Sequence, residues 1–198
     1  MTMKNKLFEQ FQTSKFVDSS ASVIYMADFS KRTNSVRAVE ICENSAPLTP
    51  DGSKDMDCLS ILNSCGYLLT FNIFNDNQFI DSLGNTLKHP EACGFIQDNL
   101  NWICFIEIKD CKPKNVTTYN SEIKEKMKVC KQCLLDVNIL QTSHKVYALA
   151  SYPRKKTSFD DSIFNDTFEV KRLYDETGII FMASNSISVT EKTIERIQ

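Results

Sequence analysis

The sequence predicts an α/β protein in which helices flank a mixed central β-sheet. Three observations lead to this prediction: a short apolar run that starts at Trp102, a long amphipathic pattern over residues 119–141, and the order of elements in the second half, which reads strand, strand, helix, strand, helix, strand. Because a hairpin joins antiparallel strands and a strand-helix-strand crossover normally joins parallel ones, both pairings are expected in one sheet.

The first residues predict a short helix that docks on the body of the protein. Leu7, Phe8 and Phe11 stand at helical spacing within residues 4–12. Apolar residues at this spacing line one face of a helix, so the helix is expected to be amphipathic.

The following fifty residues carry weaker signals. Residues 23–26 and 36–42 fit either strands or short helices. Residues 46–53, with prolines, a glycine and hydroxyl side chains, predict a loop and give the best internal boundary. Residues 57–69 begin with a capping-type aspartate and predict a short helix that stops at Gly66.

Two hairpins are expected in the middle of the chain. Residues 68–74 and 78–80 flank an Asn-Asp-Asn stretch, whose residues tolerate the left-handed turn conformation. Residues 93–96 and 102–109 flank a second turn at Asp98. The second strand of this hairpin, residues 102–109, is expected to lie in the interior of the sheet.

The C-terminal half carries the strongest helix signal. Residues 119–141 hold one apolar stripe. Its members stand three or four residues apart: Ile123, Met127, Cys130, Leu134 and Val137. Residues 145–151 predict a further strand, residues 160–176 a second helix with Gly178 just beyond its end, and residues 179–183 a final short strand.

Length and composition bound the classes of protein to consider. The 198 residues predict a single domain, with an N-terminal elaboration over about 1–65 and a core over about 66–198. A formal charge of -2 gives no global attraction to nucleic acid or membranes. The eight cysteines are expected to be reduced, with Cys93, Cys104 and Cys130 packed as small hydrophobes. The expected location is cytoplasmic, with no membrane partner, because neither a signal peptide nor an apolar run of spanning length is visible.

Glu107 and Lys109 form the first candidate site. Standing two apart on a strand, they project from one face, while Ile106 and Ile108 pack on the other. A carboxylate and an ammonium at the end of a buried strand cost free energy unless they meet each other, a metal ion or a phosphate. A structural ion pair is the alternative explanation.

The hairpin that ends in Glu-x-Lys, followed by a loop, a helix and a strand, resembles the PD-(D/E)xK nuclease superfamily over about residues 93–183. The resemblance implies a restriction-endonuclease-like core and metal-dependent cleavage of DNA or RNA with Mg²⁺ or Mn²⁺ as cofactor. It implies that Glu107 binds the metal, that Lys109 orients the attacking water, and that Gln132 on the following helix supports the site. Hard oxygen ligands beside a cation suit such chemistry.

The sequence departs from this family at one position. Relatives carry an acidic residue in the first hairpin strand, where this chain reads Cys93-Gly94-Phe95. Gly94 has no side chain to bind a metal, and losing one of two carboxylates would weaken a Mg²⁺ site. Asp98 in the expected turn, or Asp81 upstream, could take the role instead.

A group of basic residues follows the candidate strand and predicts a nucleic-acid-binding surface in a chain of acidic net charge. They lie on one face of the long helix or in the loops beside it: Lys112, Lys114, Lys124, Lys128, Lys131, Arg154, Lys155 and Lys156. A solvated helix face is the common alternative for any single lysine.

Two functional hypotheses follow, with a plain α/β protein of unrelated role as a third. In the first, the protein is a metal-dependent nuclease that uses Glu107, Lys109 and Gln132, with Asp98 as second metal ligand. In the second, suggested by Gly94, it is an inactive descendant that binds nucleic acid or a protein partner, as in a restriction or anti-phage defence assembly.

Overall fold

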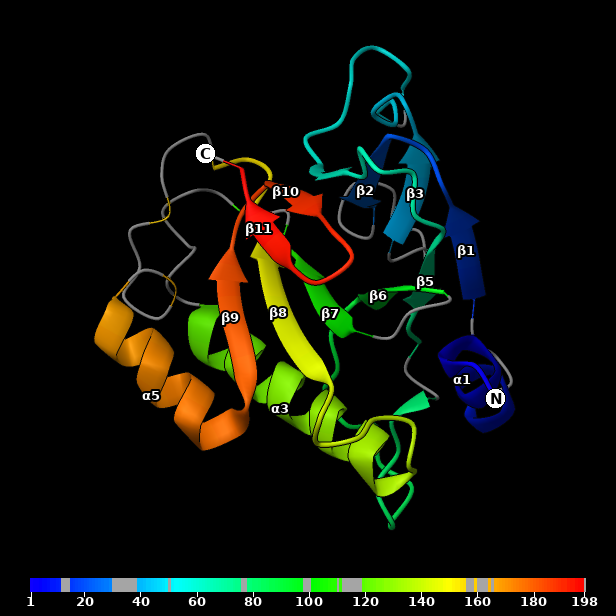
Figure 1. Ribbon diagram of the computed structural model, residues 1–198. Coiled ribbons are helices and arrows are strands. Elements are labelled where there is room, and N and C mark those ends of the chain that lie inside the picture. Colours follow the sequence, from blue (N-terminus) through cyan, green and yellow to red (C-terminus); the bar gives the residue numbers. More distant parts are fainter. Residues whose placement is uncertain are drawn as a thin grey trace.

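The computed structural model describes residues 1–11, 15–29, 39–49, 51–75, 78–97, 101–109, 111, 119–155, 159, 164 and 166–197. Within them the protein has three helices and two mixed β-sheets (Figure 1). The α/β class expected from the sequence is confirmed, but the expected single central sheet is accompanied by a second one.

The larger sheet has the strand order β1-β5-β6-β7-β8-β9. These strands are β1 Lys15–Ser19, β5 Leu69–Ile73, β6 Ala92–Ile96, β7 Trp102–Ile108, β8 Lys145–Ser151 and β9 Ile179–Ala183. Strands β1, β5, β6 and β7 pair antiparallel, whereas β7, β8 and β9 pair parallel. The expected hairpin of β6 with β7 and the crossover from β7 to β8 are both confirmed.

The smaller sheet has the order β11-β10-β4-β2-β3 and joins strands from both ends of the chain. Its members are β2 Val23–Asp28, β3 Val39–Glu43, β4 Leu59–Leu62, β10 Ser186–Val189 and β11 Ile194–Arg196. Strand β10 pairs parallel with β4, so the last strands complete a sheet that the first residues began.

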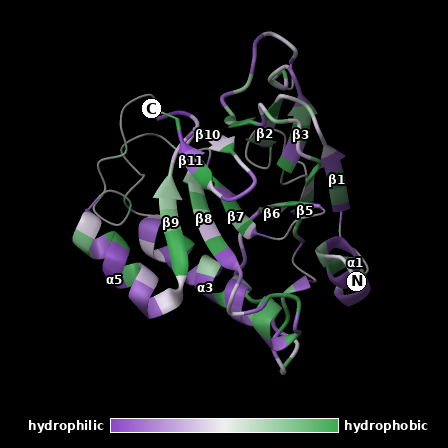
Figure 2. Cartoon of the chain, in the orientation of Figure 1, coloured by the Kyte–Doolittle hydropathy of each residue, from purple (hydrophilic) through white to green (hydrophobic). Residues whose placement is uncertain are grey.

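The layers are the small sheet, the large sheet and the helices, in that order. The helices are α1 Met3–Gln10, α3 Asn120–Asp136 and α5 Thr167–Thr177. One apolar cluster fills the space between the sheets, and another fills the space between the large sheet and the helices. The hydropathy colouring agrees, since β8 and β9 are largely hydrophobic while α3 and α5 alternate (Figure 2).

Three expectations about elements are corrected. Residues 57–69 contain strand β4 rather than a helix, because Leu59 and Ile61 alternate with less buried residues and enter the core between the sheets. Residues 78–80 do not form a hairpin with β5, which pairs with β1 and β6 instead. The helix expected over residues 160–176 is interrupted at Asp166, whose carboxylate accepts hydrogen bonds from the first turn of α5, and residues 160–163 and 165 lie outside the described residues.

The ends of the two long helices follow the expected chemistry. Gly178 adopts a left-handed conformation with a φ of 60° and ends α5. Helix α3 ends earlier than its apolar pattern, at Asp136, because Asn138 takes a left-handed φ of 57° and turns the chain. The expected stripe packs in the core as far as Leu134, and Cys130 is buried within it.

Strand β7 alternates between the two cores. Ile103, Phe105 and Glu107 face the helices, while Cys104 and Ile106 face the small sheet. Trp102 anchors the strand by donating a hydrogen bond from its indole nitrogen to the Thr190 carbonyl oxygen, at 3.0 Å.

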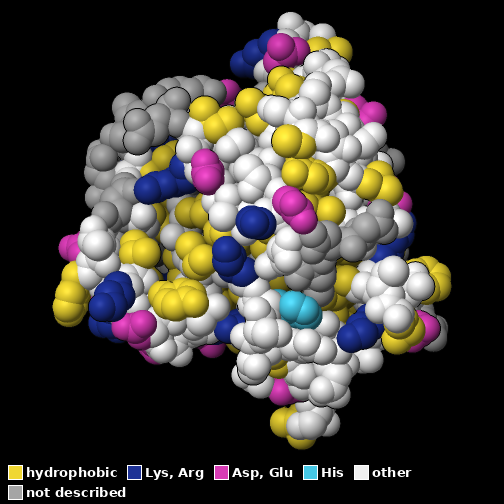
Figure 3. Space-filling model, viewed as in Figure 1, with side chains coloured by type: hydrophobic (Ala, Val, Ile, Leu, Met, Phe, Trp, Pro, Cys, Tyr) yellow, Lys and Arg dark blue, Asp and Glu magenta, His cyan; other side chains and the backbone are white. Residues whose placement is uncertain are grey.

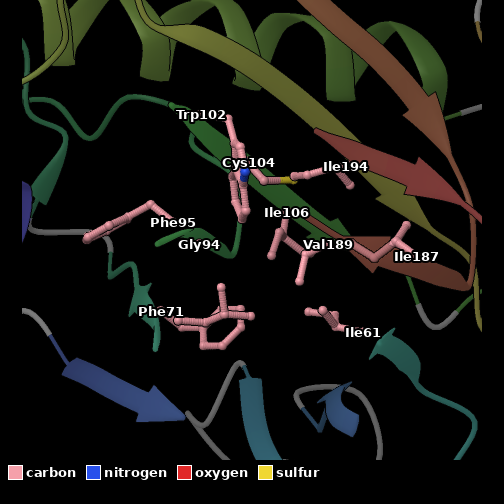
Figure 4. Close-up of a pocket in the computed structure, with 11 residues that line it drawn as sticks. Ile61, Phe71, Gly94, Phe95, Trp102, Cys104, Ile106, Ile187, Val189 and Ile194 are labelled. Carbon is pink, nitrogen blue, oxygen red and sulfur yellow. The ribbon is translucent and has the colours of Figure 1, made fainter. Parts of the chain in front are cut away.

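Gly94 belongs to the core between the sheets. It pairs with Cys104 on β7 and with Phe71 on β5, and the Phe71 ring lies against it (Figure 4). A β-carbon at this position would stand 3.0 Å from two ring atoms of Phe71. The surrounding side chains leave a cavity of only about 10 Å³, which has room for no more than about one water. The glycine therefore accommodates the phenylalanine ring.

A Gly94→Ala variant is expected to lower the free energy of unfolding by about 1–3 kcal/mol, because the added methyl group overpacks the space under the Phe71 ring. Urea unfolding measures the loss. In a Phe71→Leu background, Gly94→Ala should lower the free energy of unfolding by less than it does in the native chain. An equal loss in both backgrounds would contradict this account of Gly94.

Candidate functional site

Glu107 is a fully buried carboxylate that accepts hydrogen bonds from two lysines. Lys109 and Lys126 each place Nζ 2.7 Å from the same oxygen, Oε1. Lys109 comes from the end of β7 and Lys126 from α3, which covers that face of the sheet. The expected contact between Glu107 and Lys109 is present, and Lys126 is an additional partner.

Local structure fixes both ammonium groups. The Lys109 backbone N–H donates to the Ser151 carbonyl oxygen at 2.8 Å, which continues the parallel ladder one residue past β7. Its Nζ also lies 5.5 Å from the centre of the Tyr119 ring, at the start of α3. Lys126 directly precedes Met127, a core residue of α3, so the packing of the helix brings the lysine over the sheet.

The second carboxylate oxygen of Glu107, Oε2, is buried and has no hydrogen-bond partner among the described residues. A buried acceptor of this kind costs free energy, and in a native protein it calls for an explanation such as a bound ion.

Glu91 supplies a neighbouring carboxyl group. The ladder pairs Ala92 of β6 with Ile106 of β7, and extending this register by one residue sets Glu91 opposite Glu107 on the helix-facing side. Burial raises the pKa of Glu91 to about 7, and the charges of Glu107 and Asp28 add to the shift. The two carboxyl groups therefore interact across the hairpin.

This register bears on the missing acidic residue of the first hairpin strand. Gly94 faces the small sheet, on the side opposite to Glu107. Glu91, three residues earlier, is the acidic residue that the hairpin sets beside Glu107. Asp81 lies elsewhere in a tight turn, where its carboxylate accepts from Leu83 N, Asn85 N and the Asn85 side chain. Asp98 lies outside the described residues.

Glu122 borders the two lysines on the solvent side. Its Oε1 lies 3.6 Å from Lys109 Nζ and 3.5 Å from Lys126 Nζ, and its side chain is 36% exposed. Partial burial opposes ionisation of Glu122, but the two lysine charges outweigh it and hold its pKa below the ordinary value. Burial likewise opposes the charge on Lys109, yet the Glu107 carboxylate keeps the pKa of this lysine above its ordinary value.

Three of the expected nucleic-acid-binding lysines face α5. Lys128 pairs with Glu176 at 2.7 Å, and Lys131 donates to the carbonyl oxygens of Thr177 and Gly178 at 2.6 and 3.2 Å. Lys124 lowers the pKa values of two α5 carboxyl groups, Glu169 and Glu176, through its charge. Lys128 and Lys131 therefore connect two helices of the protein, and Lys124 acts on α5 through its charge.

A Lys131→Met variant is expected to lower the free energy of unfolding by about 0.5–1.5 kcal/mol, because the ammonium group caps the last carbonyl oxygens of α5. Chemical denaturation measures it, with Lys171→Met on the exposed surface of α5 as the control. Unchanged stability combined with weaker oligonucleotide binding would instead support a nucleic-acid role for Lys131.

Gln132 is not in contact with Glu107. Its amide donates to Asp136 at 2.7 Å, and the residue lines a groove of about 250 Å³ between α3 and the end of α5. The position on the helix that reaches Glu107 is Lys126, six residues earlier.

The remaining basic residues are distributed over several places. Arg154 and Lys155 follow the carboxyl end of β8, next to the carboxyl end of the parallel strand β7, which Lys109 follows. Lys155 Nζ lies 5.2 Å from the centre of the Phe159 ring. Lysines 112, 114 and 156 lie outside the described residues. On the face shown in Figure 3, lysine and arginine side chains are scattered among other types. No single basic patch dominates that view.

Sequence reasoning missed three members of this cluster: Glu91, Lys126 and Glu122. A signal for Glu91 existed, since counting outward from the hairpin turn aligns residue 91 with residue 107. The signal for Lys126 was the Glu122 to Lys126 spacing of four residues on a helix.

The donor set fits a hard divalent cation. The two carboxyl groups of Glu91 and Glu107 offer oxygen ligands, and Mg²⁺ commonly takes one or two carboxylates together with waters and substrate phosphate. Within the described residues, no three His, Cys, Asp or Glu side chains stand together as a metal-binding group.

Comparison with models of protein families finds no match, and comparisons with curated proteins and with solved structures find none either. In the part of the chain that the structure describes, no helix is long and apolar enough to cross a membrane. Fold and site together define an α/β protein with a buried carboxylate and ammonium cluster at the end of an interior strand.

Proposed function

We propose that the protein is a metal-dependent phosphodiesterase that cleaves nucleic acid, with Glu107 and Glu91 as the metal-binding carboxylates. One observation carries this proposal. A fully buried carboxylate has one oxygen without a described partner, beside a second carboxyl group and two ammonium groups. Oxygen ligands suit Mg²⁺ or Mn²⁺. The resemblance of residues 93–183 to PD-(D/E)xK nucleases supports the same assignment.

Each residue of the cluster has a role in this proposal. Glu107 positions both lysines, because its Oε1 accepts a hydrogen bond from each. Lys109 and Lys126 supply positive charge for the scissile phosphate, and Lys109 also orients the attacking water. Glu91 becomes a metal ligand by releasing the proton that its raised pKa lets it hold near pH 7. A bound Mg²⁺ would lower the pKa of a coordinated water and neutralise charge on the phosphate.

A cleavage assay tests the proposal. The purified chain is incubated with plasmid, linear duplex, single-stranded DNA and RNA in Mg²⁺ or Mn²⁺. Cleavage that EDTA stops is expected, and it should fall about 100-fold or more in Glu91→Gln and Lys109→Gln. Lys171→Met on α5 serves as the control and should cleave normally. The proposal fails if no substrate is cut, or if these two active-site variants cut as fast as the native chain.

The second candidate function is a non-catalytic subunit that binds nucleic acid or a protein partner, as in a restriction or defence assembly. The observation that favours it is the lack, among the described residues, of a third side chain to complete a metal-binding group. This function predicts that the protein binds oligonucleotides, that the affinity falls as salt rises, and that Glu107→Gln leaves the affinity unchanged. Tight Mn²⁺ binding that depends on Glu107 would exclude it.

A further inference from the structure

We propose that Lys109 and Lys126 form a binding site for a phosphate group and that the Glu122 carboxylate occupies this site in the free protein. The ligand class is the phosphodiester group of a nucleic acid. In naming that class the inference rests on the proposed function, while the site itself rests on four side chains: Glu107, Lys109, Lys126 and Glu122.

The charges of these side chains leave room for an anion. Two ammonium groups converge on a single oxygen of Glu107, and one carboxylate neutralises only one of them. Glu122 contributes a second negative charge from the solvent side, and Glu91, with a pKa of about 7, adds partial negative charge from the β6 side. An anion that replaced Glu122 would keep the same balance of charge.

The contacts of Glu122 are weak enough to be replaced. Its two distances of 3.5 and 3.6 Å are much longer than the 2.7 Å that each lysine makes with Glu107. Ion pairs of this length with a partly exposed carboxylate stabilise a protein less than short ones, whereas a phosphate can accept short, charge-assisted hydrogen bonds from both lysines. The Glu122 side chain is 36% exposed, so solvent is available to it if it leaves the lysines.

The surroundings favour an anion at the same place. The charge of Lys88 reaches Glu122 and helps to lower its pKa, so a third lysine lies near. Glu122 stands in the first turn of the 17-residue helix α3, whose dipole stabilises negative charge. The side chains of both lysines are 14% exposed and that of Glu122 is 36% exposed, so Glu122 is the most solvent-accessible member of this group.

Oligonucleotide binding without metal tests this inference. Fluorescence anisotropy in EDTA at low salt follows labelled single-stranded and duplex DNA. Glu122→Gln is expected to lower the Kd about five- to tenfold by removing the competing charge. Glu125→Gln, an exposed residue on the same helix, makes the same change in net charge and should leave the Kd nearly unchanged. The double variant Glu122→Gln/Lys126→Gln should lose the improvement.

Two outcomes overturn the inference: equal effects of Glu122→Gln and Glu125→Gln, or an improvement that persists in the double variant. Because the assay contains EDTA, it is independent of cleavage. Tighter binding by Glu122→Gln with no cleavage under any metal would support the phosphate site and reject the nuclease. Metal-dependent cleavage with an unchanged Kd in Glu122→Gln would reject the phosphate site alone.

Discussion

Replacing Glu107 by alanine is expected to lower the free energy of unfolding by about 3–5 kcal/mol, although the residue belongs to the proposed reaction centre. Its carboxylate is fully buried and accepts from two ammonium groups, each only 14% exposed. Without it, Lys109 and Lys126 face each other with the more distant Glu122 as their nearest counter-charge. Two like charges in a poorly solvated place repel, so the native state loses stability.

A double-mutant cycle measured by urea unfolding separates this effect from simple loss of packing. Lys126→Met removes one of the two ammonium groups and keeps much of the side-chain volume. We expect Glu107→Ala/Lys126→Met to be clearly more stable than the sum of the two single losses implies, because the double variant no longer holds two unbalanced charges. Strict additivity would show that Lys126 and Glu107 do not interact.

The sequence was most informative where burial on both sides of an element left little choice. Strand β7 is buried throughout, and its apolar run between a turn and a charged end predicted both its extent and the directions of Glu107 and Ile106. Helix α3 was equally clear, because its buried residues repeat every three or four positions. In both elements the local pattern and the tertiary environment agree.

The elements that were missed depend on partners distant in the sequence. Strand β4 is short, and what keeps it extended is pairing with β2 and with β10, which lies more than a hundred residues later. Strand β5 pairs with β6, although residues 74–91 separate the two strands in the sequence. The turn-forming residues 75–77, which follow β5, had predicted a hairpin with residues 78–80 instead. Turn chemistry indicates where a chain reverses, but it does not choose the strand that it pairs with.

The candidate site was predicted in part for the same reason. The Glu-x-Lys pair is a local feature, and its contact could be derived from the alternation of a strand. The acidic partner depends on the register of β6 against β7, which sets Glu91 rather than residue 94 beside Glu107. The lysines of α3 were assigned to a nucleic-acid-binding surface because the position of α5, with Glu169 and Glu176 opposite them, comes from tertiary packing and is not visible in the sequence.

Replacing Glu91 by glutamine is expected to stabilise the protein above neutral pH and to impair metal binding. The folded-state pKa of about 7 lies above the ordinary value of 4.5, so the native chain binds more protons than the unfolded chain between these two pH values. Native stability therefore falls as pH rises from 4.5 to 7, and the full loss is present above pH 7. Glutamine stays neutral, so the variant should be more stable by about 1–3 kcal/mol at pH 8 and nearly equal to the native chain at pH 4.5.

Calorimetric titration with Mn²⁺ measures the functional side of the same substitution. At pH 7 about half of the Glu91 groups carry a proton, so binding to the native chain should release about half a proton, detected as a difference between buffers of unlike ionisation enthalpy. Glu91→Gln should bind Mn²⁺ at least about tenfold more weakly and release no proton. Ionised Glu91 would then destabilise the free protein and bind the metal ion. Metal binding would in that case compensate for the stability that this carboxylate costs. If Glu91→Gln gained no stability at pH 8 and bound Mn²⁺ like the native chain, Glu91 would have no part in the metal site.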